Sequence, residues 1–101
     1  MDSSTKARNM DAETAMAFAG DAFEKRHPRD TWPTWLRKCV VPSYTKLENG
    51  NYLVSFAVTL KANRDTKSIF KVEVDSSTAL TTIVVDVPLH EVNEDELVSA
   101  N

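Results

Sequence analysis

Few side chains in this sequence have the chemistry of a catalytic nucleophile. The chain has one cysteine, Cys39, and two histidines, His27 and His90. A cysteine nucleophile needs a base beside it. His27 could be the base for Cys39 if the fold brings the two side chains together. No G-x-S-x-G or cysteine-protease signature surrounds any candidate. Cys39 lies on an apolar stripe, where a free cysteine is usually buried and inert, so we predict no catalytic residue and no enzyme activity.

Metal and phosphate chemistry also lack their usual residue sets. His90, Glu91 and Glu94 are close in sequence, with His90 and Glu94 one turn apart if that segment is helical. A structural zinc site takes four nitrogen or sulfur ligands, and the chain has only one cysteine and two histidines. A solvated acidic tail is therefore the favoured interpretation. Gly20 and Gly50 are the only glycines and cannot build a phosphate-binding loop, so we predict no metal and no cofactor.

One segment carries residue types that are common at binding surfaces. Two tryptophans, Trp32 and Trp35, lie within four positions of each other. Three cationic residues lie beside them: Arg29, Arg37 and Lys38. Tryptophan and arginine are enriched at the energetic centres of protein interfaces, and segments between regular elements often carry function. These five residues are the predicted partner-binding site. The alternative is that both tryptophans close the open end of a sheet while the cations are solvated, since aromatic side chains mainly fill cores.

The distribution of charge indicates which partners are favoured. The 101 residues include 15 acidic and 12 basic side chains, for a formal net charge of −3. Residues 86–101 contain five acids and no base, which leaves residues 1–85 with ten acids, 12 bases and a balance of +2. The net acidity argues against nucleic acid as the main partner. The basic segment favours an acidic protein.

Composition indicates the class of protein. Hydrophobic residues make up 42% of the chain and charged residues 27%, as is usual for a soluble globular domain. The apolar runs are only a few residues long, so we expect no membrane span, and residues 1–6 carry no visible secretory signal. A single cysteine fits a reducing compartment, and we expect a cytoplasmic protein.

The first half of the domain has helical spacing. Apolar residues recur at i, i+3, i+4 and i+7 and predict a helix that begins near Asp11 and ends at Pro28. A second, short helix is predicted to end at Cys39, with Thr31 as its N-cap and Pro33 in its first turn.

The second half changes to a period of two, which is typical of strands. Four strands are predicted, over roughly residues 43–47, 52–60, 69–75 and 80–87. Asn49-Gly50 predicts a type I′ hairpin turn with a positive φ at both residues. Short links between successive strands require antiparallel pairing. The predicted fold class is α+β, an N-terminal helix and a short second helix packed on a curved four-stranded antiparallel meander sheet.

The predicted organisation is a single domain over residues 11–88. Residues 1–10 are polar and aperiodic, so we expect a disordered lead. Residues 89–101 are expected to be a disordered acidic tail or a short C-terminal helix capped by Asn93. The predicted core comes from the first helix and the central strands: Met16, Ala19, Phe23, Tyr52, Val54, Phe56, Val58, Phe70, Val72 and Val74.

Two segments carry a resemblance to a known superfamily. The leading helix, the strand over Tyr52–Phe56 and the segment Lys71–Ala79 resemble the cystatin-like superfamily. Lys71–Ala79 is similar to the Val-x-Val-Asp-x-x-Thr-Gly strand and turn of PepSY-type and NTF2-like immunity domains, with Ala79 where the pattern usually has glycine. The resemblance covers residues 11–87 as topology and about nine residues as motif. It implies an inhibitor, an immunity protein or a regulatory module. The Gln-x-Val-x-Gly segment of cystatin inhibitors is absent, so inhibition of cysteine proteases is not implied.

Together these observations predict a small, non-enzymatic binding or regulatory module that acts by binding a protein partner. The alternative is an NTF2-like pocket protein, in which helix and sheet enclose a cavity for a small ligand or a substrate. A surface patch would favour the first and a deep cleft with converging polar groups the second. A third hypothesis, nucleic-acid binding through the tryptophan and arginine segment, is disfavoured by the acidic tail. The sequence is also compatible with a homodimer.

Overall fold

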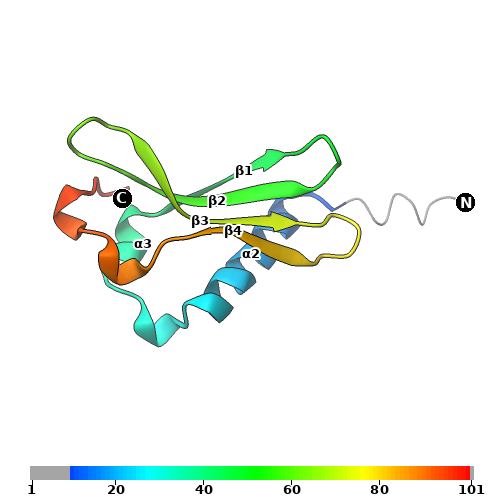
Figure 1. Ribbon diagram of the computed structural model, residues 1–101, viewed down its shortest axis with the longest axis horizontal. Helices are drawn as coiled ribbons and strands as arrows, with labels where there is room; N and C mark the ends of the chain where they lie inside the picture. The colour runs from blue at the N-terminus through cyan, green and yellow to red at the C-terminus, as the bar shows by residue number, and fades with distance from the viewer. Residues whose placement is uncertain (1–9, 101) are drawn as a thin grey trace, which may run out of the picture.

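Helix α2 (Ala12–Arg26) begins where the sequence predicts, in the computed structural model that describes residues 10–100 (Figure 1). Asp11 is its N-cap, and the Asp11 carboxylate accepts a hydrogen bond from the Thr14 amide at 2.8 Å. Hydrogen bonds from the side chain and backbone of Thr14 lower the pKa of Asp11, because they favour the charged form. The helix ends at His27 because Pro28 disfavours helical geometry in the residue before it. The predicted first helix is confirmed.

The second helix is shorter than predicted. A 3-10 turn (Arg29–Thr31) is followed by helix α3 (Trp35–Cys39). The Thr31 hydroxyl donates to the Pro28 carbonyl at 2.6 Å and does not cap the helix. Trp32 has an extended backbone, with φ −74° and ψ 130°, as expected for a residue that precedes proline. A helix cannot run through it, so the prediction of Thr31 as the N-cap is wrong.

The second half forms the predicted antiparallel meander (Figure 1). Its strands are β1 (Val41–Lys46), β2 (Tyr52–Thr59), β3 (Thr66–Val74) and β4 (Thr81–Asp86). They lie in the order β1-β2-β3-β4, and each is antiparallel to the next. Helix α2 packs on one face of this sheet and contacts all four strands. The predicted α+β fold class is confirmed.

The turn between β1 and β2 differs from the predicted type I′. The Gly50 amide donates to the Leu47 carbonyl at 2.9 Å. Gly50 has a positive φ of 91°, whereas neither Glu48 nor Asn49 has one. This is the arrangement of a type I turn followed by a left-handed glycine. The Asn49 side chain accepts a hydrogen bond from the Asn51 amide at 2.9 Å, a local contact that favours this turn.

A β-bulge in β3 adds a core residue that strict alternation misses. The register between β2 and β3 shifts between Phe56 and Ala57, so Ile69 has no residue opposite it. Ile69 and Phe70 are consecutive, yet both are buried, because an extra residue interrupts the alternation of faces. A second bulge, at Val84, shifts the register of β4 against β3.

The core lies between α2 and the sheet. Ala15 and Ala19 are fully buried, and their small side chains let the helix lie close to the strands. Eight residues of the predicted core are buried: Ala19, Phe23, Tyr52, Val54, Val58, Phe70, Val72 and Val74. The other two, Met16 and Phe56, are half-buried and pack against its margin.

The C-terminal segment packs onto the domain. The sequence predicts a disordered tail or a short helix for residues 89–101, whereas the structure has two 3-10 turns (Leu89–Glu91 and Glu94–Glu96). The Asn93 side chain caps the second turn by accepting from the Asp95 amide at 3.0 Å. Leu97 is buried and forms a β-bridge with Leu60, directly after β2. These apolar contacts tie the acidic segment to the sheet.

The predicted disordered lead over residues 1–10 falls almost wholly outside the described residues. Met10 is described, and it packs against the core. The Met10 carbonyl accepts a hydrogen bond from the Tyr52 hydroxyl at 3.1 Å. Within residues 10–100, the chain has no helix with the length and apolar character needed to cross a membrane.

The turn between β3 and β4 contains Ala79, the residue that stands where the similar strand and turn pattern usually has glycine. The Asp75 carboxylate accepts hydrogen bonds from the Ser77 hydroxyl, the Ser77 amide and the Thr78 amide, at 2.8, 2.9 and 3.0 Å. These bonds, first among them that from the Ser77 side chain, lower the pKa of Asp75. Ala79 follows with a φ of 65°, a conformation that costs an L-residue about 1–2 kcal/mol and is open to glycine.

We expect Ala79→Gly to raise the free energy of unfolding by about 0.5–1 kcal/mol, because the relief of the left-handed strain exceeds the entropy that glycine adds to the unfolded chain. Urea unfolding measures the change. The control is Ala17→Gly on the exposed face of α2, the same chemical change in a helix, which should lower stability by about 1 kcal/mol. A loss of stability at both positions would contradict the strained turn.

Candidate functional site

The five residues of the predicted site divide between the core and the surface. Trp35 is buried, with 4% of its surface exposed, which matches the alternative that a tryptophan fills the core. Trp32 is half-buried, and Arg29, Arg37 and Lys38 are exposed. Trp35 therefore presents almost no side-chain surface to a partner, whereas the other four remain accessible.

Trp32 lies in an open groove of about 460 Å³ between α2 and the segment formed by α3 and the start of β1. We call it the Trp32 groove. Its lining includes the small residues Ala17 and Gly20 and six larger apolar residues: Phe23, Trp32, Leu36, Val40, Pro42 and Phe56. Four charged side chains also line it: Asp21, Glu24, Arg29 and Arg37. The structure thus brings three of the predicted residues, Arg29, Trp32 and Arg37, to one groove, and Lys38 is not part of its lining.

The indole of Trp32 is fixed by contacts at its edge and its face. Its Nε1 donates a hydrogen bond to the His27 carbonyl at 2.6 Å, and its ring centroid lies 5.6 Å from that of Phe23. The guanidinium carbons of Arg29 and Arg37 lie 5.5 and 5.6 Å from the ring centroid, within the distance of a cation–π interaction. The groove therefore presents one aromatic surface flanked by two cations.

The two arginines differ in their pairing. Arg29 forms an ion pair with Glu24, which neutralises part of its charge. Arg37 is exposed, and among residues 10–100 no carboxylate forms an ion pair with it. Arg37 can therefore donate hydrogen bonds to a carboxylate of a bound molecule while it stays next to the apolar lining.

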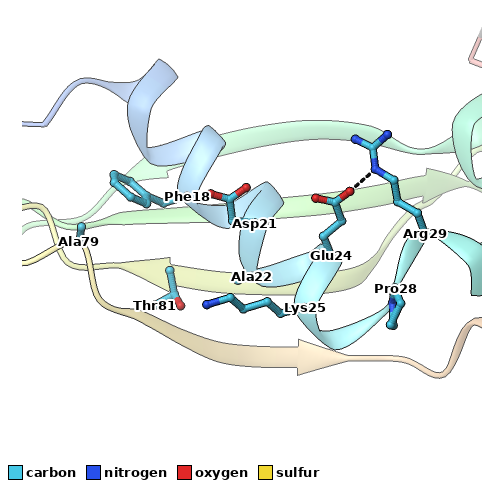
Figure 2. Close-up of a pocket in the computed structure, with 9 residues that line it drawn as sticks. All are labelled: Phe18, Asp21, Ala22, Glu24, Lys25, Pro28, Arg29, Ala79 and Thr81. Carbon is cyan, nitrogen blue, oxygen red and sulfur yellow. Dashed lines mark hydrogen bonds and ion pairs between the residues drawn. The ribbon is translucent and has the colours of Figure 1, made fainter.

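A second open groove, of about 680 Å³, lies on the other side of α2, between that helix and β4 (Figure 2). We call it the β4 groove. Figure 2 shows the Glu24–Arg29 ion pair at one end and Phe18 near Ala79 at the other. Glu24 and Arg29 line both grooves, so this ion pair is part of the boundary between them.

The sequence did not reveal an ionic cluster at the end of α2. The Asp86 carboxylate accepts from His27 Nε2 at 2.7 Å and from Arg26 Nε at 2.6 Å. His27 and Asp86 are 59 positions apart, so only the fold brings them together. The cluster fastens the last turn of α2 to the end of β4. In the sequence, His27 lies directly before Pro28 and Asp86 lies two residues before Pro88, each at the end of a predicted element.

Cys39 and His27 make different contacts in the structure. Cys39 is buried in the core as a free thiol, and His27 Nε2 is engaged by Asp86. Within the described part of the chain, no hydrogen bond joins Cys39 to His27, and no group of three His, Cys, Asp or Glu side chains is arranged to hold a metal ion.

Comparison of the chain with protein-family models, curated proteins and solved structures gives no match. The resemblance to the cystatin-like superfamily therefore stays a prediction.

We expect Trp32 to be quenched by acrylamide more strongly than Trp35, because Trp32 is half-buried at an open groove whereas only 4% of the surface of Trp35 is exposed. The measurement uses two variants that each leave a single tryptophan, Trp35→Phe and Trp32→Phe. The first should show a large Stern–Volmer constant and the second a small one. Equal quenching in the two variants would mean that Trp32 is as shielded as Trp35 and that the groove is closed in solution.

Proposed function

We propose that this protein is a small, non-enzymatic binding or regulatory module, and that its Trp32 groove takes an apolar side chain and a neighbouring carboxylate of a protein partner. The observation that carries the proposal is the half-buried Trp32 indole flanked by two guanidinium groups, one of them, Arg37, without an ion-pair partner in residues 10–100. Tryptophan and arginine at the centre of a patch are the residue types that dominate binding energy at interfaces.

The shape of the groove supports a protein partner. It is open to solvent, and the helix and sheet meet in a packed core of buried side chains. An open apolar groove with charges along its rim suits a side chain presented by another protein. The acidic partner predicted from the sequence fits the cations of this groove.

A small ligand is the second candidate. A groove of about 460 Å³ falls within the range of ligand sites, about 300–1,000 Å³, as an NTF2-like pocket would require. An aromatic or aliphatic carboxylate would satisfy the same two features, the apolar lining and Arg37. The free thiol of Cys39 supports a reducing, cytoplasmic location for either candidate.

Gly20 offers a way to block the groove without disturbing the fold. It lines the groove in the middle of α2, and a Cβ at this position would meet no atom within 4 Å. We therefore expect the side chain introduced by Gly20→Leu to fill part of the groove. The loss of a glycine from the helix interior should also raise the free energy of unfolding, by about 0.5–1 kcal/mol at most.

The test is a selection of displayed random peptides on the full chain, with counter-selection on the Gly20→Leu variant. We expect the selected peptides to combine an aliphatic or aromatic residue with Asp or Glu. Arg37→Glu should weaken their binding about tenfold or more, mainly through slower association, with a smaller effect at high salt. Lys38→Glu, the same charge change on an exposed side chain outside the lining, should change binding little.

Peptides that bind the wild type, Gly20→Leu and Arg37→Glu equally well would contradict the proposal. Failure to select any peptide, together with NMR shifts at groove residues on addition of small aromatic carboxylates, would favour the second candidate. Thermal unfolding of each variant verifies that the fold is intact, since exposed substitutions usually change stability by less than about 0.5 kcal/mol.

A further inference from the structure

Strand β4 is an edge of the sheet with an apolar, uncharged surface. It has β3 on one side and no strand on the other within the described residues. Residues 76–85 contain no charged side chain. Leu80, Ile83 and Val84 are 70%, 43% and 55% exposed. An edge of this kind presents unpaired backbone N–H and C=O groups together with apolar side chains, and it is a template for another strand.

The opposite edge is protected. Strand β1 contains Pro42 and Lys46, two residue types that discourage strand addition. Beyond the start of β1, where Val41 pairs with Ala57, the C-terminal segment continues along β2. There the Val98 amide donates to the Thr59 carbonyl at 2.9 Å and the Lys61 amide to the Glu96 carbonyl at 2.8 Å. In residues 10–100 neither β1 nor β4 has a strand on its outer side, but Pro42 and Lys46 discourage addition to β1, so β4 is the edge that favours pairing.

We propose that β4 pairs in antiparallel fashion with β4 of a second copy of this chain, which joins the two sheets into one. A chain with one edge that favours pairing closes after two copies, because each partner uses up the edge of the other. This arrangement therefore favours a closed dimer of two copies over an open-ended stack of many copies.

The charges near the junction are compatible with self-association. Any two-fold register that pairs residues 81–85 places Asp86 opposite an uncharged residue of the partner's strand, because residues 76–85 carry no charge. Asp86 also forms an ion pair with Arg26 and a hydrogen bond with His27 within its own chain. No like charges face each other along the strands, a condition that antiparallel pairs need.

The bulge at Val84 does not remove this surface. Bulges on edge strands often prevent pairing by twisting the strand. Here the bulged residue is an exposed valine, so it adds apolar area in place of a charge. The β4 groove beside the strand, lined by Phe18, Ala22 and Thr81 among others, gives the partner's side chains space between helix and sheet (Figure 2).

The experiment is sedimentation velocity of the full chain over a wide range of concentration, with one lysine substitution at each edge. We expect the wild type to sediment as a reversible dimer. Val84→Lys should weaken dimerisation about tenfold or more, since it introduces a charge at the junction on each copy. Val41→Lys is the matched control, because Val41 is 50% exposed on the β1 edge and Val84 55% exposed on the β4 edge, and it should leave the dimer constant unchanged.

Hydrogen exchange supplies a readout that identifies the surface. Amides of β4 should become more protected as the protein concentration rises, and amides of β1 should not. A wild type that is monomeric at every concentration would overturn the proposal, as would a dimer that Val41→Lys and Val84→Lys weaken equally. Circular dichroism of both variants verifies that they are folded.

Discussion

The ring of Phe23 connects helix α2 to the sheet and to the segment before α3. Phe23 lies in the last turns of α2 and is buried. Its ring centroid is 5.1–5.6 Å from those of four other rings: His27, Trp32, Phe56 and Phe70. Phe70 and Phe56 come from the sheet, Trp32 from the segment before α3, and His27 from the end of the helix. One side chain therefore joins the core, the Trp32 groove and the cluster around Asp86.

A second constraint is that a single helix is too narrow to cover a four-stranded sheet. A helix is about 10 Å wide and strands are about 4.8 Å apart, so one helix covers roughly two strands well. The central strands are largely buried, whereas β1 is exposed along its length and β4 over most of it. Both grooves flank α2 for this reason. The same shortage of cover produces the candidate binding site and leaves most of β4 exposed.

Local patterns in the sequence were sufficient to predict the elements and their order. The apolar stripe from Ala12 to Phe23 and the stop at Pro28 defined α2, and the alternation around Tyr52–Val58 defined β2. Two failures were local: Thr31 is not the N-cap, because Pro33 imposes an extended backbone on Trp32, and the turn before β2 is not type I′. The others were tertiary or depended on one residue of register. Ile69 is buried because of a bulge, which alternation cannot reveal.

The candidate site was predicted only in part, because similar residues have different environments. Trp32 and Trp35 are three positions apart in an aromatic and basic segment, yet Trp35 points into the core and Trp32 lines a groove. The extended backbone of Trp32, imposed by Pro33, separates the two. Residues from four segments of the chain line the groove, and no local sequence pattern predicts that these segments lie together.

Phe23 couples the core to the Trp32 groove, and the Phe23→Leu variant tests this coupling. Two quantities are measured, the free energy of unfolding and the acrylamide quenching of Trp32 in a chain that also carries Trp35→Phe. We predict a loss of about 1–3 kcal/mol, since the smaller side chain leaves a void, and stronger quenching of Trp32 under native conditions. Phe18→Leu, on the other flank of the helix, should leave the quenching unchanged. A loss of stability without any change in the quenching of Trp32 would contradict the coupling.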